Sequence, residues 1–197
     1  MSLILSINSF GALNLANVNQ PLSYIFMQAH KLLIENFYKA FNNLNADRMI
    51  ESYHDEVVFW DPVFENLDAR KAKAMWHMLC SNAKGFSLDF RDVKAGDEYG
   101  SCNWVAVYTF SKTGRQVIND VKAHFKFHEG KIVEHMDDFD LWKWSRQALG
   151  TPGWIFGWTP FLQNKIRNTA KTGLKKYIKQ TGSESTNDKS LQTDAGA

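Results

Sequence analysis

The stretch Tyr53-His-Asp-Glu-Val-Val-Phe-Trp-Asp61-Pro62 joins the end of a helical segment to a short apolar strand that closes with a carboxylate before proline. Proline biases the preceding residue towards extended geometry, so we expect the strand to reach Asp61. Side chains alternate along a strand, which places Asp61 on the same face as Val57 and Phe59. A carboxylate on an apolar face indicates either a cavity that the acid can reach or hydrogen bonds to nearby backbone groups.

The composition is typical of one medium-sized domain with appendages. The chain has 197 residues, 44% of them hydrophobic and 14% aromatic, which is enough for a packed core. A formal net charge of +2 argues against a strongly basic nucleic-acid-binding protein. No apolar run reaches the roughly 18 residues of a membrane-spanning helix. Cys80 and Cys102 lack a metal-binding or disulfide context, which favours buried free thiols and a cytoplasmic location.

Helical patterns come first along the chain. We expect residues 1–26 to form a flexible extension, although the helical pattern already begins at Ser23. The first helix carries apolar residues at helical spacing, namely Leu33, Phe37, Phe41 and Leu44. Asn45 is placed to cap a second, short helix, and Asp68 to cap a third. The face of the third helix that should pack on a sheet consists of Ala72, Met75, Trp76, Leu79 and Ala83.

Strand patterns follow the helices. Three runs are predicted at about 86–94, 102–111 and 116–128, and a last one extends from Lys131 to about Leu141. Lys112-Thr-Gly114 and Glu129-Gly130 are predicted turns. Helices followed by antiparallel strands specify an α+β fold, in which a strongly curved sheet wrapped around a long helix encloses a cone-shaped cavity.

Two strands place polar side chains on apolar faces. In the run 116–128, Asn119 interrupts an otherwise apolar face, where it either makes a structural hydrogen bond or faces a ligand. In the last strand His135 and Asp137 point the same way, between Val133 and Phe139. A carboxylate and an imidazole in an apolar site can transfer a proton next to a carbonyl, since burial raises the pKa of an aspartate. The structural alternatives are that His135 is a hydrogen-bonded core histidine and that Asp137 is solvated or caps the following helix.

The segments Asn36-Phe-Tyr-Lys-Ala-Phe41, Asp47-Arg-Met-Ile50 and Tyr53 to Asp61 resemble the ketosteroid isomerase and SnoaL-like polyketide cyclase branches of the NTF2-like superfamily. The resemblance implies a cone-shaped fold and a homodimer formed through the sheet. It places Asp61 on the isomerase base and Tyr53 on its supporting tyrosine. Phe37 and Ala123 stand where the isomerase has its oxyanion-hole tyrosine and aspartate, so this chain should not isomerise steroids by that mechanism.

The SnoaL-like resemblance extends from about Phe37 through Gly130-Lys-Ile-Val-Glu-His-Met-Asp137 to Gln147-Ala-Leu-Gly150. It implies that Asp137 matches the general base of the cyclases, with Asp138 as the adjacent alternative. The cyclases usually carry a Glu-His-Trp-Asp pattern on the last strand, and Met136 replaces its tryptophan here. Ala123 lies near the position of the cyclase histidine, so the resemblance leaves cyclase activity unsupported. The domain is expected to span residues 27–150.

A basic helical extension is predicted for residues 151–180. Thr159 and Pro160 suit the start of a helix whose apolar stripe is Leu162, Ile166, Ala170, Leu174 and either Tyr177 or Ile178. Trp154, Phe156, Trp158 and Phe161 precede or begin it. The helix either packs over the cone or a dimer interface, or contacts an anionic membrane surface or a partner protein through residues 160–180. Residues 181–197 are expected to form a disordered tail.

The sequence therefore predicts a protein that binds a small, largely apolar molecule in its cone, with isomerase-like or cyclase-like acid/base chemistry that requires no cofactor. The candidate catalytic residues are Asp61, Asp137 and His135. The candidate ligand-binding residues are Tyr53, Phe37, Trp76, Asn119 and Phe139. We expect no metal, because no metal-ligand spacing is present, and no nucleic-acid partner. The alternative is a non-catalytic module that docks to a partner or membrane through its basic helix.

Overall fold

The structure is a computed structural model that describes the backbone of residues 21–193 and the side chains of residues 21–182. The helices are α1 (Leu22–Asn42), α2 (Ala46–Ile50), α3 (Ala69–Asn82), α4 (Leu141–Leu149), α5 (Thr151–Phe156) and α6 (Pro160–Thr193). The strands are β1 (Tyr53–Trp60), β2 (Ser87–Ala95), β3 (Tyr99–Phe110), β4 (Arg115–His128) and β5 (Lys131–Asp138). The predicted α+β class is confirmed, with helices first and four successive strands after α3.

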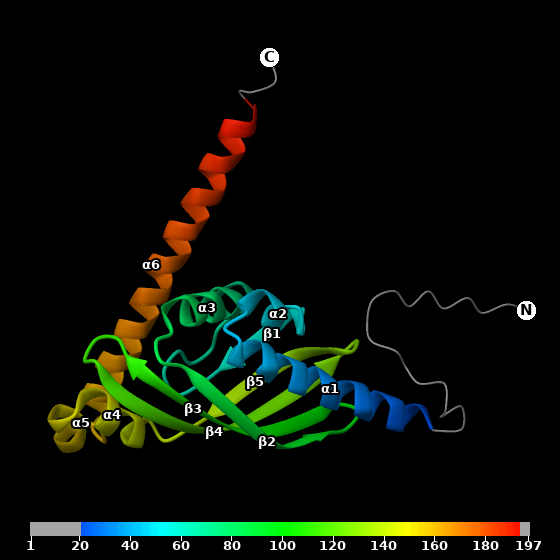
Figure 1. Ribbon diagram of the computed structural model, residues 1–197, viewed down its shortest axis with the longest axis horizontal. Helices are drawn as coiled ribbons and strands as arrows, with labels where there is room; N and C mark the ends of the chain where they lie inside the picture. Colours follow the sequence, from blue (N-terminus) through cyan, green and yellow to red (C-terminus); the bar gives the residue numbers. More distant parts are fainter. Residues whose placement is uncertain (1–20, 194–197) are drawn as a thin grey trace, which may run out of the picture.

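One curved, open sheet contains all five strands in the order β1-β5-β4-β3-β2 (Figure 1). β1 pairs with β5 in parallel, and the other three pairs are antiparallel. Gly114 and Gly130 end the two predicted hairpin turns with φ of +71° and +73°, a region that glycine enters without steric cost. These turns set the β3–β4 and β4–β5 pairings that bring distant polar residues onto one concave face.

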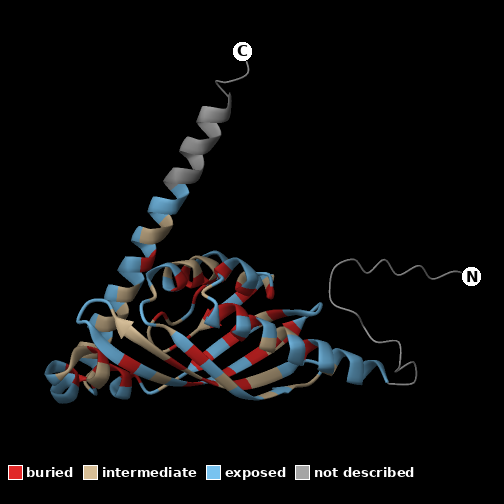
Figure 2. Cartoon of the chain, in the orientation of Figure 1, coloured by how far each residue is buried: buried red, intermediate tan, exposed pale blue. Residues whose placement is uncertain are grey.

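The helices before β2 cover that concave face. α1 contacts β2 and β3, and α3 lies against β1 (Figure 1). The buried residues gather between these layers (Figure 2), and α1 contributes Ile34, Phe37, Tyr38 and Phe41 to the core. Both predicted caps are confirmed, because the Asn45 side chain accepts from the Arg48 N–H and the Asp68 side chain accepts from the Lys71 N–H.

β5 differs from its predicted pattern near its start. Ile132 is fully buried and Val133 only partly, whereas strict alternation would bury Val133 with His135. The cause is an irregularity in the β4–β5 register between Lys126 and Phe127, which shifts the inward-facing positions by one residue. The strand also ends at Asp138 rather than near Leu141, because the Asp140 side chain accepts from the Lys143 N–H and starts α4.

The helices at the two chain ends overlap the segments expected to be flexible. α1 begins at Leu22, so the last residues of the predicted flexible extension 1–26 are helical, while residues 1–20 lie outside the described part. α6 begins at Pro160 as predicted, but its backbone stays helical to Thr193, beyond the start of the expected tail 181–197. No proline interrupts this stretch, and adding residues to an existing helix avoids the cost of a new nucleus. Residues 194–197 are outside the described part.

α6 packs over the open end of the cone with its N-terminal half. Leu174 is buried in the main core, and Ala170 and Ile178 pack against the same cluster. Figure 1 shows α6 leaving the body of the domain beyond α3. Of the two packing arrangements predicted for this helix, the one over the cone is therefore present. None of the helices in the described part combines the length and apolar character required to span a membrane.

Candidate functional site

A cavity of about 840 Å³ lies between the concave face of the sheet, α3 and the first half of α6. Its wall is largely apolar and includes Phe59, Trp76 and Phe139. The side chains that add hydrogen-bonding groups to that wall include Asp61, Tyr108, Asn119 and Asp137. A mostly apolar pocket with few polar groups is the usual form of a small-molecule site.

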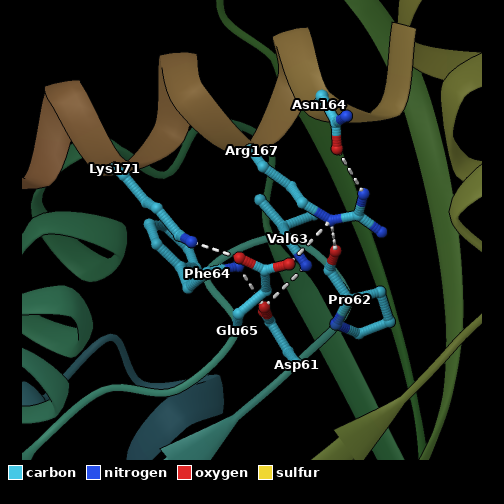
Figure 3. A network of polar contacts seen from close by, with 8 residues as sticks. All are labelled: Asp61, Pro62, Val63, Phe64, Glu65, Asn164, Arg167 and Lys171. Carbon is cyan, nitrogen blue, oxygen red and sulfur yellow. Dashed lines mark hydrogen bonds and ion pairs between the residues drawn. The ribbon is translucent and has the colours of Figure 1, made fainter. Parts of the chain in front are cut away.

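Asp61 lies where β1 ends, and the turn after it determines its geometry. Its Oδ1 accepts hydrogen bonds from the backbone N–H groups of Val63 (2.8 Å) and Phe64 (2.5 Å). Figure 3 shows the carboxylate held under this turn, with the α6 side chains above it. Both bonds end on one oxygen, so the backbone fixes the orientation of the carboxyl group. The predicted alternative of local backbone hydrogen bonds is thus present together with exposure to the cavity.

The environment of Asp61 favours its neutral form. Burial raises the pKa of the Asp61 carboxyl to about 7, the N–H groups of Phe64 and Val63 oppose that rise, and the charge of Asp137 adds to it. The side chain is only 9% exposed, which is consistent with desolvation as the largest cause. A carboxyl group with a pKa near neutrality can both take and give a proton at physiological pH.

The turn after Asp61 is tied to α6 by a polar network. Arg167 Nε donates to the carbonyl oxygen of Pro62 (3.0 Å) and lies 3.4 Å from a Glu65 carboxylate oxygen. Lys171 pairs with the other Glu65 oxygen (Figure 3). Glu65 itself adopts a φ of +56°, a left-handed conformation that costs a non-glycine residue roughly 1–2 kcal/mol. α6 thereby contacts the residues that position Asp61.

A second chain of hydrogen bonds runs behind the cavity to Asp137. Trp76 Nε1 donates to the Tyr53 hydroxyl (2.8 Å), which lies 2.7 Å from His135 Nδ1. His135 Nε2 lies 3.1 Å from Asp137 Oδ1. If the Tyr53 hydroxyl donates to Nδ1, the imidazole is neutral and its Nε2–H donates to Asp137, so every group is satisfied. Trp104 Nε1 donates to the same Asp137 oxygen (3.1 Å).

Only part of the predicted site lines the cavity. Trp76, Asn119 and Phe139 are in the wall with Asp61 and Asp137. Phe37 and Tyr53, predicted to bind a ligand, and His135, predicted to be catalytic, are outside the lining of this cavity. His135 is fully buried between aromatic rings, at centroid distances of 5.3 Å from Phe37 and 4.5 Å from Phe125. Its imidazole supports Asp137 from behind, which is the arrangement of a hydrogen-bonded core histidine.

Tyr108, which the sequence favours as a core or cavity-wall residue, is a polar group of the wall that was not among the candidate ligand-binding residues. It shares the inward parity of Trp104 and Ala106 on β3, which was the available signal. The Trp144 indole N–H donates to its hydroxyl oxygen (2.8 Å), so the hydroxyl proton of Tyr108 stays free for another acceptor. Burial raises the pKa of Tyr108, and the charge of Asp61 adds to that rise, which keeps the phenol neutral.

Within the described residues, one trio of potential metal ligands is present away from the cavity. The ligand atoms of His54, His128 and Glu129 all lie within 4.8 Å of one another. His54 Nδ1 accepts from the Glu56 N–H, which leaves the proton of a neutral imidazole on Nε2, the nitrogen nearest Glu129. The Nε2 atoms of His54 and His128 each lie 3.9 Å from a Glu129 carboxylate oxygen, so the trio is a surface group of ion-pair contacts outside the cavity.

A comparison with family models identifies the family, and similar solved structures identify the fold. The model of the SnoaL-like domain matches residues 34–135. Similar solved structures include a putative polyketide cyclase from Xanthomonas campestris pv. campestris (19% identity, 62% of this chain and 98% of that chain, TM-score 0.54). An LEH-like epoxide hydrolase from M. tuberculosis is similar at 17% identity (62% and 91%, TM-score 0.54).

A Catenulispora acidiphila protein of ketosteroid isomerase-like fold, solved with trimethylamine, shares 10% identity (65% and 97%, TM-score 0.54). No curated protein matched the chain. At these identities the likeness of the solved structures establishes the fold alone. The family match covers more than half of the chain and includes β1, α3 and most of the sheet. The protein belongs to the SnoaL-like domain family and has the NTF2-like, ketosteroid isomerase-like α+β fold.

Proposed function

We propose that the cavity binds a small, largely apolar carbonyl compound and that Asp61 moves a proton on it. The observation that carries this proposal is the Asp61 carboxyl group. It lies in an apolar wall, one oxygen is fixed by two backbone N–H groups, and burial raises its pKa to about 7. A carboxylate in that state is suited to removing a proton from a carbon next to a carbonyl.

In this proposal the free oxygen of Asp61 takes the proton and the carbonyl oxygen becomes an enolate oxygen. The Tyr108 hydroxyl, whose own oxygen already accepts from Trp144, donates a hydrogen bond to that oxygen. The protonated Asp61 then returns the proton to the same carbon or to a conjugated one, which regenerates the carboxylate. This cycle balances without any cofactor, and Asp137 with Asn119 supplies further polar contacts to the ligand.

The cavity also supports an enzyme over a non-catalytic docking module, the two classes of function predicted from the sequence. A non-catalytic module would fill the cone with its own aromatic side chains, whereas here open space of about 840 Å³ meets both Asp61 and Asp137. Two of the solved structures with this fold are named as a putative polyketide cyclase and an epoxide hydrolase, which are enzyme names. These points favour an enzyme over the module, with the fold likeness as analogy only.

Deuterium exchange tests the proposal without knowledge of the natural substrate. A panel of cyclic ketones in D₂O is followed by NMR for loss of the signals of protons next to the carbonyl. We expect the wild-type protein to accelerate exchange for at least one ketone and Asp61→Asn to abolish the acceleration. Tyr108→Phe should slow it by roughly 10²-fold, the typical cost of losing one oxyanion donor.

Asp138→Asn is the matched control, since Asp138 is an exposed aspartate on the opposite side of β5 from Asp137. It should exchange like wild type. Equal exchange by wild type and Asp61→Asn would refute the role of Asp61. Ligand binding is measured separately by chemical-shift changes of the wall residues. If Asp61→Asn still binds the ligand and no variant, wild type included, accelerates exchange, the protein binds the ligand without catalysing proton transfer.

A further inference from the structure

A group of large apolar side chains is exposed at the end of the molecule formed by α4, α5 and the first turn of α6. We call this group the aromatic corner; it consists of Trp142, Trp154, Ile155, Phe156, Trp158 and Phe161. The exposed fractions reach 62% for Trp154, 63% for Trp158 and 77% for Phe161. Figures 1 and 2 show α5 at the edge of the domain, with little chain over it. A contiguous exposed apolar patch usually marks an interaction site.

The packing of α5 is the reverse of an ordinary amphipathic helix. Its side towards α4 carries two buried glycines, Gly153 and Gly157. A Cβ atom on Gly153 would collide with the backbone of Ser145, and one on Gly157 would collide with the Ser145 side chain. The helix therefore packs through its backbone, and its tryptophan, isoleucine and phenylalanine must point outwards. Burial in the monomer does not account for these large side chains.

The aromatic corner is held in place by polar contacts. The Arg146 guanidinium lies over the rings of Trp142 (4.5 Å) and Trp154 (5.1 Å). Trp158 Nε1 donates to the carbonyl oxygen of Ile155 (3.1 Å). Side chains that are already ordered lose little conformational entropy when they bind a surface. The arrangement combines apolar rings with a cation next to them.

The charge of this segment identifies the kind of partner. From Leu141 to Gln180 the chain contains eight lysines and arginines and no acidic residue. All 21 acidic residues are elsewhere, with the remaining 15 basic ones, so the rest of the chain is net negative. A symmetric contact between two copies would bring two such basic segments together, and like charges repel. A surface complementary to the aromatic corner has an apolar interior and anionic groups at its boundary with water.

We propose that the aromatic corner docks the protein on an anionic lipid bilayer. Trp154, Trp158 and Phe161 insert at the level of the headgroups, where tryptophan is enriched, and Lys143, Arg146 and Lys165 contact the lipid phosphates. The apolar stripe of α6 is not part of this surface, because Leu174 and its neighbours are packed on the domain core. The lipid surface therefore consists of α4, α5 and the start of α6 and overlaps the predicted 160–180 segment only at its beginning. The docking does not depend on the proposed function.

Sedimentation with vesicles tests the proposal on the full chain. One set of vesicles is pure phosphatidylcholine and the other contains equal parts of phosphatidylcholine and phosphatidylglycerol. Wild type should bind the mixed vesicles at least tenfold more tightly, and added salt should weaken this binding. Trp154→Ala and Phe161→Ala should each weaken it roughly tenfold, and Lys143→Gln about fivefold.

Tyr99→Ala is the matched control, because Tyr99 is an equally exposed aromatic residue on β3, outside the aromatic corner. It should bind like wild type. The substituted side chains are exposed, so circular dichroism should show that the variants are folded. Because Trp154→Ala and Phe161→Ala are independent, the test still works if one of them does not fold. Absence of wild-type binding to the mixed vesicles, or unchanged binding in both aromatic variants, overturns the proposal. Dissociation of a dimer by Trp154→Ala in light scattering, without vesicle binding, would instead identify a second copy as the occupant.

Discussion

His135 and Asp137, both on β5, share a buried contact of 3.1 Å between Nε2 and Oδ1, while the other nitrogen of His135 meets the Tyr53 hydroxyl. The histidine is outside the cavity wall and the aspartate is in it. Asp137 is thus held by His135 from behind the wall and by Trp104 within it, and presents its remaining hydrogen-bonding capacity to the cavity. The relationship makes the stability of the core and the geometry of the site depend on the same hydrogen bonds.

Removing the Tyr53 hydroxyl tests this dependence. Tyr53→Phe leaves the Trp76 N–H and His135 Nδ1 without their partner in a buried site, and each unsatisfied group costs about 1–3 kcal/mol. We expect the free energy of unfolding in urea to fall by at least about 2 kcal/mol. Tyr99→Phe, at an exposed position, should change it by less than about 0.5 kcal/mol. An unchanged free energy of unfolding in Tyr53→Phe would show that this chain of hydrogen bonds does not stabilise the fold.

The pH dependence of stability should report the Asp61 carboxyl. Its pKa is raised from 3.8 to about 7 in the folded protein, so folding favours the protonated form. The stability contribution is therefore full below pH 3.8 and is lost as the pH rises to about 7. Asp61→Asn, which keeps an oxygen for the two N–H donors, should gain stability relative to wild type over this range, by on the order of 3–4 kcal/mol.

The measurement for Asp61 is urea unfolding of both proteins across that pH range, together with the carboxyl-carbon NMR titration of wild type. Taking the difference between the two proteins cancels the titration of all other groups to first order. A difference that stays constant with pH, or a carboxyl that titrates near 3.8, would remove the physical basis of the proposed proton transfer.

The contact of α6 with the Asp61 turn should affect local motion more than global stability. Arg167→Ala removes the hydrogen bond to the Pro62 carbonyl and one ion pair to Glu65. The Glu65 and Lys171 side chains are partly exposed, so we expect a loss of less than about 1 kcal/mol in unfolding free energy. The amide protons of Val63 and Phe64 should exchange faster. Lys165→Ala, an exposed lysine on the same helix, is the control, and equal exchange in both variants would contradict the expectation.

The family resemblance implies a homodimer through the sheet, and we propose that its outer face forms the contact. Val58, Ile118 and Met136 are apolar residues exposed on the strands, at 45%, 49% and 47%. Light scattering should then give twice the mass of the 22.6 kDa chain, and Met136→Lys should yield monomers without loss of helix content. A monomeric wild type, or a dimer insensitive to Met136→Lys, would reject this interface.

The sequence by itself determined the kinds of elements and the faces that local geometry controls. Asn45, Asp68 and Thr159 start helices where predicted, and Val57, Phe59 and Asp61 share one buried face, since caps and strand alternation depend only on neighbouring residues. The same periodicity placed His135 and Asp137 together. The resemblance to known families identified the fold and pointed to Asp61.

The tertiary structure alone decided which buried residues meet the cavity. Periodicity could not separate His135 behind the wall from Asp137 in it, nor decide whether Tyr108 is a core residue or part of the wall. The curvature of the sheet and the packing of α6 determine which side chains reach open space. The irregularity that buries Ile132 arises from strand pairing, and the outward side chains of α5 follow from its backbone contact with α4. Those arrangements depend on contacts between residues far apart in the chain, which local sequence patterns do not encode.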